Sequence, residues 1–284
     1  MNEVRIATRP SALALVQARR VAEMLQAANS QLSVRLVEVA TSGDRDQEAG
    51  IAELTETGAF VRAVQEAVID GRADLAVHSL KDLPVWGLEG LVLAAFPERG
   101  SPFDVLIGSS LDQLPAGGVV GTGSPRRVEQ LLEMRPDLST KELRGNVDTR
   151  LRKVAAGEVD AAILAEAGLD RLGKSALIAQ RLQHMVPAPG QGALAVEARG
   201  ESNFAALARS IDDKCLRTLL STERLLLSET GAGCRSALGA YATWHGADIR
   251  LEAFVADEDG RRRTTAWGQT PESAVAEARK GLGL

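Results

Sequence analysis

The feature of this chain that most constrains its fold is an alternation of short apolar runs with amphipathic stretches, which occurs twice. In the first part, predicted strands and helices follow one another at 4–8, 13–25, 34–39, 59–69 and 74–77. The pattern starts again near residue 104, with predicted elements at 105–107, 119–120, 127–134, 147–156 and 161–164. Alternation of this kind favours parallel α/β layers, so the sequence predicts two α/β lobes.

A turn-rich segment ends the second predicted lobe. The segment 187–192 (PAPGQG) precedes an apolar run at 193–197, which we expect to return as a strand to the first lobe. Two lobes joined by crossing segments leave a cleft between them, and such a cleft is the usual place for a ligand.

The last part of the chain has a different pattern. After a long helical stretch at 214–228, the segments 238–243, 249–256 and 263–267 alternate like antiparallel strands. Thr270 can cap a final helix that Pro271 opens. The predicted fold is therefore α/β with a small α+β C-terminal domain that contains a three-stranded antiparallel sheet. We place domain 1 at 1–97 and 193–211, domain 2 at 98–192 and domain 3 at 212–284.

Composition excludes several classes of protein. The net charge of −5 and the aromatic content of 3% argue against a general nucleic-acid binder. No apolar run approaches the roughly 20 residues that span a bilayer, and the N-terminus lacks the pattern of a secretory signal. We therefore expect a cytoplasmic protein without a membrane partner. Because no heptad repeat or large apolar stripe demands a partner, a monomer is expected.

The chain has only two cysteines, Cys215 and Cys234. They cannot form a disulfide framework, and neither belongs to a CxxC or Cys/His cluster with the spacing of zinc ligands. No metal site is predicted, and any cysteine chemistry must involve a single thiol.

Arginines gather in turns that open helices, in the segments 121–127 (GTGSPRR) and 143–150 (LRGNVDTR). A helix N-terminus presents unpaired backbone N–H groups and a positive dipole end, and guanidinium groups beside it can hold carboxylates or phosphates. The sequence therefore predicts a small ligand with several negative charges.

Several motifs in order resemble the hydroxymethylbilane synthase family, also called the porphobilinogen deaminase family. They are IATR at 6–9, HSLKD at 78–82, the Arg126-Arg127 pair, LRGN at 143–146, GQGA at 190–193 and Gly233-Cys234. The resemblance implies two lobes like those of type II periplasmic binding proteins and a third domain that carries a dipyrromethane cofactor on a cysteine. It also implies four condensations of porphobilinogen, each with loss of ammonia, followed by hydrolytic release of the linear tetrapyrrole hydroxymethylbilane.

The resemblance assigns binding roles to a set of polar residues. Those expected to bind the cofactor are Ser79, Lys81, Asp82, Thr122, Ser124, Arg126, Arg127 and Arg144. Those expected to bind the substrate are Arg9, Ser11, Arg144, Arg150 and Gln191. A charge-assisted pair with a substrate carboxylate contributes about 1.5 to 3 kcal/mol. The alternatives are that the arginines only decorate a solvated helix face and that the hydroxyls are plain N-caps.

Asp82 is the residue that we expect to be catalytic. Loss of ammonia and the following carbon attack both place positive charge on a pyrrole ring, whose N–H can donate to a carboxylate, and an aspartate there can stabilise that charge and relay protons. Lys81 could bind a substrate carboxylate or form a surface ion pair worth under about 1 kcal/mol. His78 is expected to be hydrogen-bonded scaffolding rather than a catalytic group.

Cys234 is predicted to carry the cofactor as a thioether. It lies in the loop 231–236 (GAGCRS), where small neighbours leave room for an adduct and Arg235 would favour the thiolate. Cys215 lies within an amphipathic helix and is expected to be inert packing.

The chain departs from the family pattern at a few positions. Thr57 stands where relatives usually have a lysine, Pro10 and Pro125 replace residues that are usually not proline, and Ala232 changes the usual Gly-Gly-Cys. None of these changes removes a predicted chemical group except the charge at position 57.

Two other functions fit parts of the sequence. The first is a two-lobed binding or sensor protein for a small polycarboxylate without turnover, which a covalent cysteine adduct would exclude. The second is a nucleotide-using enzyme, but neither GxxxxGK[ST] nor a GxGxxG that follows a strand is present.

Overall fold

The computed structural model describes residues 3–39, 56–231 and 237–284 of the chain. These residues form two compact units, each made of two separate stretches of chain. The first unit comprises Met1–Arg99 and Ala193–Arg217, and the second comprises Gly100–Gly192 and Thr218–Leu284.

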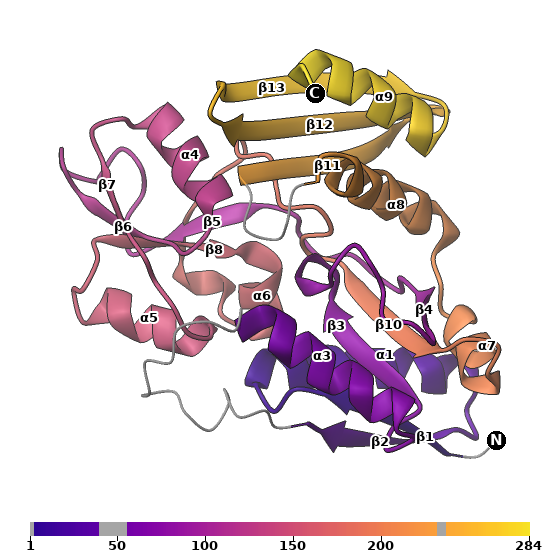
Figure 1. Cartoon of the computed structure of the whole chain (residues 1–284). Coiled ribbons are helices and arrows are strands. Elements are labelled where there is room, and N and C mark those ends of the chain that lie inside the picture. The colour runs from indigo at the N-terminus through magenta and orange to yellow at the C-terminus, as the bar shows by residue number, and fades with distance from the viewer. Residues whose placement is uncertain (1–2, 40–55, 232–236) are drawn as a thin grey trace. The chain divides into compact units, whose positions relative to one another are not determined.

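The first unit is a five-stranded sheet with helices packed against it, in the strand order β2-β1-β3-β10-β4 (Figure 1). β1 pairs in parallel with β2 and β3, whereas β10 runs antiparallel to β3 and β4. Its elements are β1 (Glu3–Thr8), α1 (Ala12–Ala28), β2 (Ser33–Glu38), α3 (Glu56–Ile69), β3 (Leu75–Ser79), the 3-10 helix η1 (Leu80–Asp82), β4 (Leu91–Ala95), β10 (Leu194–Arg199) and α7 (Asn203–Arg209).

Helix α1 shows how the sequence pattern builds this unit. Val21 and Leu25 lie on its buried face and pack into a core with residues of β1, β3 and β10, while Arg19 on the opposite face is exposed. The β10 strand confirms the expectation that the chain returns to the first lobe after the 187–192 turn segment.

The second unit contains a mixed five-stranded sheet in the order β7-β6-β8-β5-β9. β6 is parallel to β7 and β8, and β5 is antiparallel to β8 and β9. Its elements are β5 (Asp104–Ile107), β6 (Val119–Gly121), α4 (Pro125–Met134), β7 (Ser139–Lys141), α5 (Val147–Ala155), β8 (Ala161–Ala165), α6 (Glu166–Arg171), the 3-10 helix η2 (Ser175–Leu177) and β9 (Ile178–Arg181).

The prediction of parallel layers is therefore only partly right, because both α/β sheets are mixed. β10 follows a turn-rich segment and β5 follows the irregular stretch after β4, so no crossover helix fixes the direction of either strand. The alternation therefore predicts a parallel strand pair only where a helix connects the two strands.

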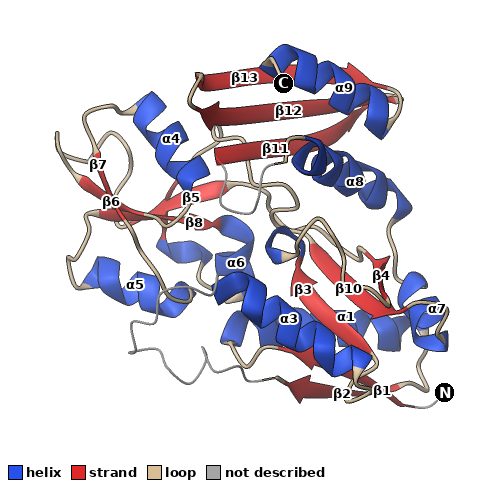
Figure 2. Cartoon of the chain, viewed as in Figure 1, coloured by secondary structure: helices blue, strands red, loops and turns tan. Residues whose placement is uncertain are grey.

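A three-stranded antiparallel sheet completes the second unit, in the order β11-β12-β13. Helix α9 packs against β12 and β13 (Figure 2), and Leu226 of α8 lies in the same apolar core as the sheet. The elements are α8 (Lys214–Glu229), β11 (Ala237–His245), β12 (Asp248–Asp257), β13 (Gly260–Gly268) and α9 (Pro271–Leu282). The Thr270 hydroxyl accepts from the Ser273 N–H at 3.2 Å and caps α9, as predicted.

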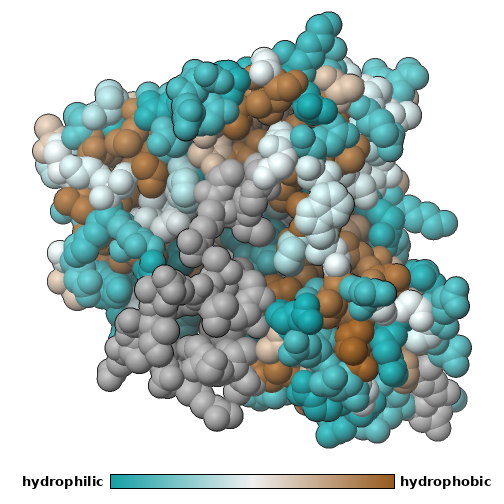
Figure 3. All heavy atoms as spheres, viewed as in Figure 1, coloured by the Kyte–Doolittle hydropathy of each residue, from teal (hydrophilic) through white to brown (hydrophobic). Residues whose placement is uncertain are grey.

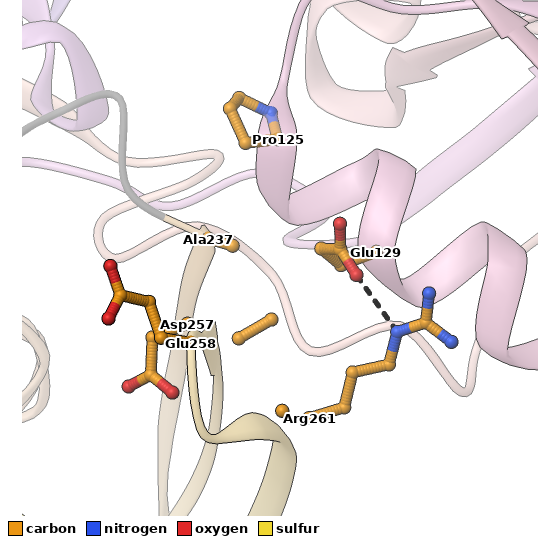
Figure 4. Close-up of a pocket in the computed structure, with 8 residues that line it drawn as sticks. Pro125, Glu129, Ala237, Asp257, Glu258 and Arg261 are labelled. Atoms are coloured by element: carbon orange, nitrogen blue, oxygen red, sulfur yellow. Dashed lines mark hydrogen bonds and ion pairs between the residues drawn. The ribbon is translucent and has the colours of Figure 1, made fainter.

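Close backbone contacts join this antiparallel sheet to the rest of the second unit. The Ala240 N–H donates to the Pro187 carbonyl at 2.9 Å. A Cβ at Gly239 would lie 2.7 Å from the Val186 carbonyl oxygen, so only glycine fits there. On the surface, Arg261 Nε donates to Glu129 of α4 at 2.9 Å (Figure 4).

The α/β class and the C-terminal antiparallel sheet are confirmed. The division into three domains at the predicted boundaries stays a prediction. No helix among residues 3–39, 56–231 and 237–284 is long and apolar enough to cross a membrane. On the face shown in Figure 3, hydrophilic residues are interspersed with smaller hydrophobic groups.

Candidate functional site

The carboxyl end of β3 positions three of the predicted site residues on one short turn. β3 is buried up to Ser79, and Leu80 is fully buried, so the chain is anchored immediately before Lys81 and Asp82. The Leu80 N–H donates to the Ala193 carbonyl at 3.0 Å, and η1 ends at Asp82. Lys81 and Asp82 are half-buried. The turn therefore holds a carboxylate and an ammonium group at the surface on a rigid base.

Ser79 receives a hydrogen bond from outside this turn. The Gln17 Nε2 of α1 donates to the Ser79 Oγ at 2.8 Å. A hydroxyl that accepts one hydrogen bond still has its own O–H to donate, so Ser79 can also donate to a carboxylate ligand.

His78 lies in the interior of the first unit, as part of a buried cluster. Its Nε2 is 3.2 Å from the Glu197 Oε2, and Gln65 Nε2 donates to both oxygens of Glu197 at 3.1 and 3.0 Å. All three side chains are buried. The burial of His78 agrees with a scaffolding role, but its Nε2 makes no hydrogen bond with the described residues, which differs from the expectation of hydrogen-bonded scaffolding.

Arg9 and Ser11 follow β1 in the first unit. Both residues are half-buried. The Ser11 Oγ accepts from the Ala14 N–H at 3.4 Å and forms the N-cap of α1, which is the alternative role considered for the predicted hydroxyls.

In the second unit, Thr122 and Ser124 shape the turn that opens α4. Thr122 is buried and its Oγ1 accepts from the Ser124 N–H at 3.2 Å. Ser124 is the N-cap residue of α4, but its side chain makes no capping hydrogen bond, and Pro125 takes the first helical position. The Ser124 hydroxyl is thus not used by its own helix.

The arginine pair of α4 is buried, with 3% of Arg126 and 6% of Arg127 exposed, and both contact Asp104. Arg126 Nη1 is 2.8 Å from one Asp104 oxygen, and Arg127 Nη2 is 2.8 Å from the other. Burial alone would raise the pKa of Asp104, but the two guanidinium groups together hold it well below its usual range. Burial lowers the pKa of Arg126 below its ordinary value, while Asp104 opposes that effect.

Gln191 joins the same cluster from the turn segment after β9. It is fully buried, and its Nε2 donates to the Asp104 Oδ1 at 3.0 Å and to the Pro102 carbonyl at 2.7 Å. The structure therefore brings together three predicted site residues, Arg126, Arg127 and Gln191, around a carboxylate that the motifs did not single out.

Arg144 lies on the turn that precedes α5, and Arg150 lies in the first turns of that helix. Arg144 is exposed and its Nε donates to Glu142 at 2.8 Å, while Arg150 Nε donates to the Gly145 carbonyl at 2.8 Å. Gly145 has a φ of +105°, and a Cβ there would lie 2.7 Å from the Thr149 side chain. Backbone conformation and the lack of space therefore both require glycine at this position of the motif.

The two cysteines differ in what the structure says of them. Cys234, Arg235 and Ala232 lie outside the described residues, as does the side chain of Thr57. Cys215 lies in helix α8, as predicted, but it is exposed, so the expectation that it is inert packing is wrong. Apolar periodicity placed it in a helix but could not show that the first two residues of that helix are exposed.

A pocket of about 860 Å³ lies within the second unit, between the start of α4 and the antiparallel sheet (Figure 4). Glu129, Asp257, Glu258 and Arg261 line it, together with Pro125, Ala237, Ala256 and Gly260. None of the predicted binding residues lines this pocket. Among residues 3–39, 56–231 and 237–284, no group of His, Cys, Asp and Glu side chains could hold a metal ion.

Sequence reasoning missed the buried carboxylates of the second unit, among them Asp104 and Glu223. Asp104 is the hub of the arginine cluster, and Glu223 of α8 accepts from the Gly190 N–H at 2.7 Å and the Ala242 N–H at 2.9 Å. Asp104 directly precedes an apolar strand, which is a weak signal that it is buried. The local sequence around Glu223 gives no comparable signal.

Comparisons with known proteins match nearly the whole chain to the family that its motifs resemble. The family model described as "Porphobilinogen deaminase, dipyromethane cofactor binding domain" matches residues 4–206, and "Porphobilinogen deaminase, C-terminal domain" matches residues 218–281. Porphobilinogen deaminase of Brevibacillus brevis is 41% identical over 98% of this chain and 94% of its own length. The enzyme of Sorangium cellulosum is 43% identical over 100% of this chain and 98% of its own length.

Similar solved structures include a BvgS VFT2 domain of Bordetella pertussis, at 16% identity and a TM-score of 0.44, which covers 74% of this chain and 86% of that one. A putative periplasmic sulfonate-binding protein of Methylobacillus flagellatus has 16% identity and a TM-score of 0.42, and covers 79% of this chain and 67% of that one.

Proposed function

The chain belongs to the porphobilinogen deaminase family, and from this membership we propose that Asp82 is its catalytic carboxylate. The protein is an enzyme, a transferase that deaminates porphobilinogen and joins four molecules of it onto a covalently bound dipyrromethane primer, releasing hydroxymethylbilane. The observation that carries this assignment is the match of the two family models, which together extend over residues 4–206 and 218–281.

The donor groups of the described residues fit a ligand of this kind. A dipyrromethane that bears acetate and propionate side chains needs cations and hydroxyls for its carboxylates. Lys81 and Ser79 supply such groups beside Asp82, and Ser124 and the arginine pair supply them at the start of α4. When bound, the dipyrromethane supplies the pyrrole carbon that receives the first substrate unit.

Asp82 has the chemistry that the reaction requires. The half-buried carboxylate sits at the end of a buried strand, so its position is fixed while its oxygens remain accessible. It can accept a hydrogen bond from a pyrrole N–H and stabilise the positive charge that develops on the ring as ammonia leaves. One of its oxygens can also take the proton that the ring loses when the new carbon–carbon bond is complete.

The cationic side chains bind and orient the substrate by its carboxylates. We assign cofactor contacts to Ser79, Lys81, Thr122, Ser124, Arg126, Arg127 and Arg144, and substrate contacts to Arg9, Ser11, Arg144, Arg150 and Gln191. Arg144 is exposed, so among the arginines its guanidinium can reach an incoming ligand with little rearrangement. Each such charge-assisted bond contributes about 1.5 to 3 kcal/mol.

Further parts of the proposal concern the setting of the enzyme. We assign the covalent thioether to Cys234. We divide the chain into three domains, at 1–97 with 193–211, at 98–192 and at 212–284, so that the second unit contains the second lobe and most of the C-terminal domain. The enzyme acts in the cytoplasm as a monomer, without a nucleic-acid or membrane partner. The net charge of −5 supports the absence of a nucleic-acid partner.

An intact-mass measurement tests the cofactor assignment. The purified protein is expected to be heavier than its sequence mass by one two-ring adduct, and Cys234→Ser abolishes the increase. Cys215→Ser is the matched control and leaves the adduct in place, because the proposal assigns the thioether to Cys234 alone. An unmodified wild-type protein that binds polycarboxylates reversibly, and does not consume porphobilinogen, would favour the binding-protein alternative.

A further inference from the structure

Asp104 is a carboxylate that contacts both arginines of α4. It is the first residue of β5, and it is fully buried. Its Oδ1 accepts from Arg127 Nε at 2.9 Å and from Gln191 Nε2 at 3.0 Å, while Arg126 Nη1 is 2.8 Å from its Oδ2. Each carboxylate oxygen therefore serves a different arginine.

The remaining contacts of the two guanidinium groups anchor them to the protein backbone. Arg126 Nη1 donates to the Val186 carbonyl at 2.7 Å, and Arg127 Nη1 donates to the Ile163 carbonyl of β8 at 2.9 Å. Gln130 of α4 also donates to the Val186 carbonyl, at 3.0 Å, and accepts from the Val186 N–H at 2.7 Å. The cluster thus ties α4 to β5, β8 and the segment that leads to Gln191.

The charge of this cluster is not balanced. Two guanidinium cations face one carboxylate, so the group carries one positive charge in excess. Adjacent buried cations repel one another strongly where the dielectric constant is low, and Asp104 offsets that repulsion. Counted over these three side chains, the charge is +1, which favours an anionic ligand.

We propose that Asp104 is a positioning residue, which holds Arg126, Arg127 and Gln191 in the arrangement that binds the carboxylates of the cofactor and substrate. This inference rests on the proposed function, and it assigns a role to a residue outside the motifs that identify the family. Asp104 acts through the arginines and glutamine and does not itself meet a carboxylate ligand, because like charges repel.

Asp104→Asn tests this role because it keeps the shape and removes the charge. The asparagine oxygen can still accept from Arg127 and Gln191, and its amide nitrogen then faces Arg126, where two donors meet. Arg126 is therefore the side chain that this change displaces. We expect a kcat at least about tenfold below that of the wild type, and a smaller fraction of protein that carries the two-ring adduct.

Asp74→Asn is the matched control. Asp74 is also a buried aspartate with an arginine partner, since Arg5 Nη2 lies 2.7 Å and Arg5 Nε 3.0 Å from its oxygens, but it precedes β3 at the end of the strand opposite to Asp82. Both variants are expected to lower Tm by at least about 6 °C, because each deprives a guanidinium of its buried counter-ion. Only Asp104→Asn is expected to change kcat and adduct loading, whereas Asp74→Asn stays within about twofold of the wild type.

The inference is overturned if Asp104→Asn lowers Tm but leaves kcat and adduct loading within about twofold of the wild type. If Asp104→Asn does not fold, the double variant Asp104→Asn with Arg127→Gln, which keeps the net charge of the cluster, is compared with Arg127→Gln alone, and equal loading and turnover in these two variants would overturn the proposal. A wild-type protein with neither adduct nor turnover would instead count against the proposed function. For this reason Tm, adduct loading and turnover are measured on the wild type together with every variant.

Discussion

The end of β3 and the start of α4 contain residues from equally strong motifs, but the structure gives them different surroundings. At the end of β3, Lys81 and Asp82 are half-buried on a short turn. At the start of α4, Arg126 and Arg127 are buried and hydrogen-bonded to a carboxylate and to backbone carbonyls. A motif can therefore mark a side chain that is accessible to a ligand, or a side chain that is buried and makes most of its contacts within the protein.

The largest effect is expected at the end of β3. Asp82→Asn removes the carboxylate that stabilises the ring charge, so kcat should fall by about 10² to 10⁴-fold, the usual contribution of a positioned acid or base. Because Asp82 is half-buried, the free energy of unfolding should change by less than about 1 kcal/mol. Steady-state turnover of porphobilinogen and urea unfolding measure the two quantities. A kcat near that of the wild type would remove Asp82 from the chemistry.

The second prediction concerns the arginine pair, where a substitution is expected to lower stability far more than Asp82→Asn does. Arg127→Gln deletes a buried cation and leaves Asp104 with one charged partner, so the free energy of unfolding should fall by about 3 kcal/mol. Urea unfolding followed by circular dichroism measures the change. If stability were unaffected, the contrast between the two regions would be wrong.

A smaller effect is expected at the exposed arginine of the α5 turn. Arg144→Gln removes a guanidinium that is exposed and bound to Glu142 at the surface, so stability should change by no more than about 0.5 kcal/mol. The KM for porphobilinogen should rise by about tenfold if Arg144 binds a substrate carboxylate. Initial rates at varied substrate concentration distinguish this result from a change in kcat. Glu142→Gln is the control, and an equal rise in its KM would assign the effect to the surface pair.

The smallest effect is a pH dependence. The pKa of Asp104 is lower in the folded protein than in the unfolded chain, so its stabilisation is present above the unfolded pKa of about 3.9 and is lost as the pH falls below it. The difference in unfolding free energy between the wild type and Asp104→Asn should be constant from pH 5 to pH 7, and about 1 kcal/mol smaller at pH 3. Urea titrations at these pH values measure it. A difference that does not shrink at low pH would mean that Asp104 is not held ionised by its arginines.

Local sequence was enough to predict the elements whose pattern is self-contained. Helix α1, the antiparallel strands β11 to β13 and the Thr270 cap of α9 were predicted because periodicity and capping depend on neighbours in the chain. The strands β4, β7 and β9 were not predicted, because short segments at sheet edges carry weak patterns. The directions of β5 and β10 depend on tertiary connections and not on local propensity.

The candidate site shows the same limit. Motifs identified Asp82, Arg126, Arg127 and Gln191 as polar residues at the ends of predicted elements. They could not show that Asp104 lies among three of these side chains, because that contact joins residues 22 or more positions apart through the folded sheet. The sequence also could not predict how exposed each residue of a helix is, and for this reason Cys215 was wrongly expected to be packed.

Because Gly239 has no side chain, β11 approaches the backbone of Val186 closely, and an added side chain would force the two apart. A single methyl group at this position would push against the Val186 carbonyl oxygen, which accepts hydrogen bonds from Arg126 and Gln130, with no charge altered. Gly239→Ala therefore disturbs the arginine pair from the side of the C-terminal sheet without changing a charge, which substitutions of arginine or aspartate cannot do.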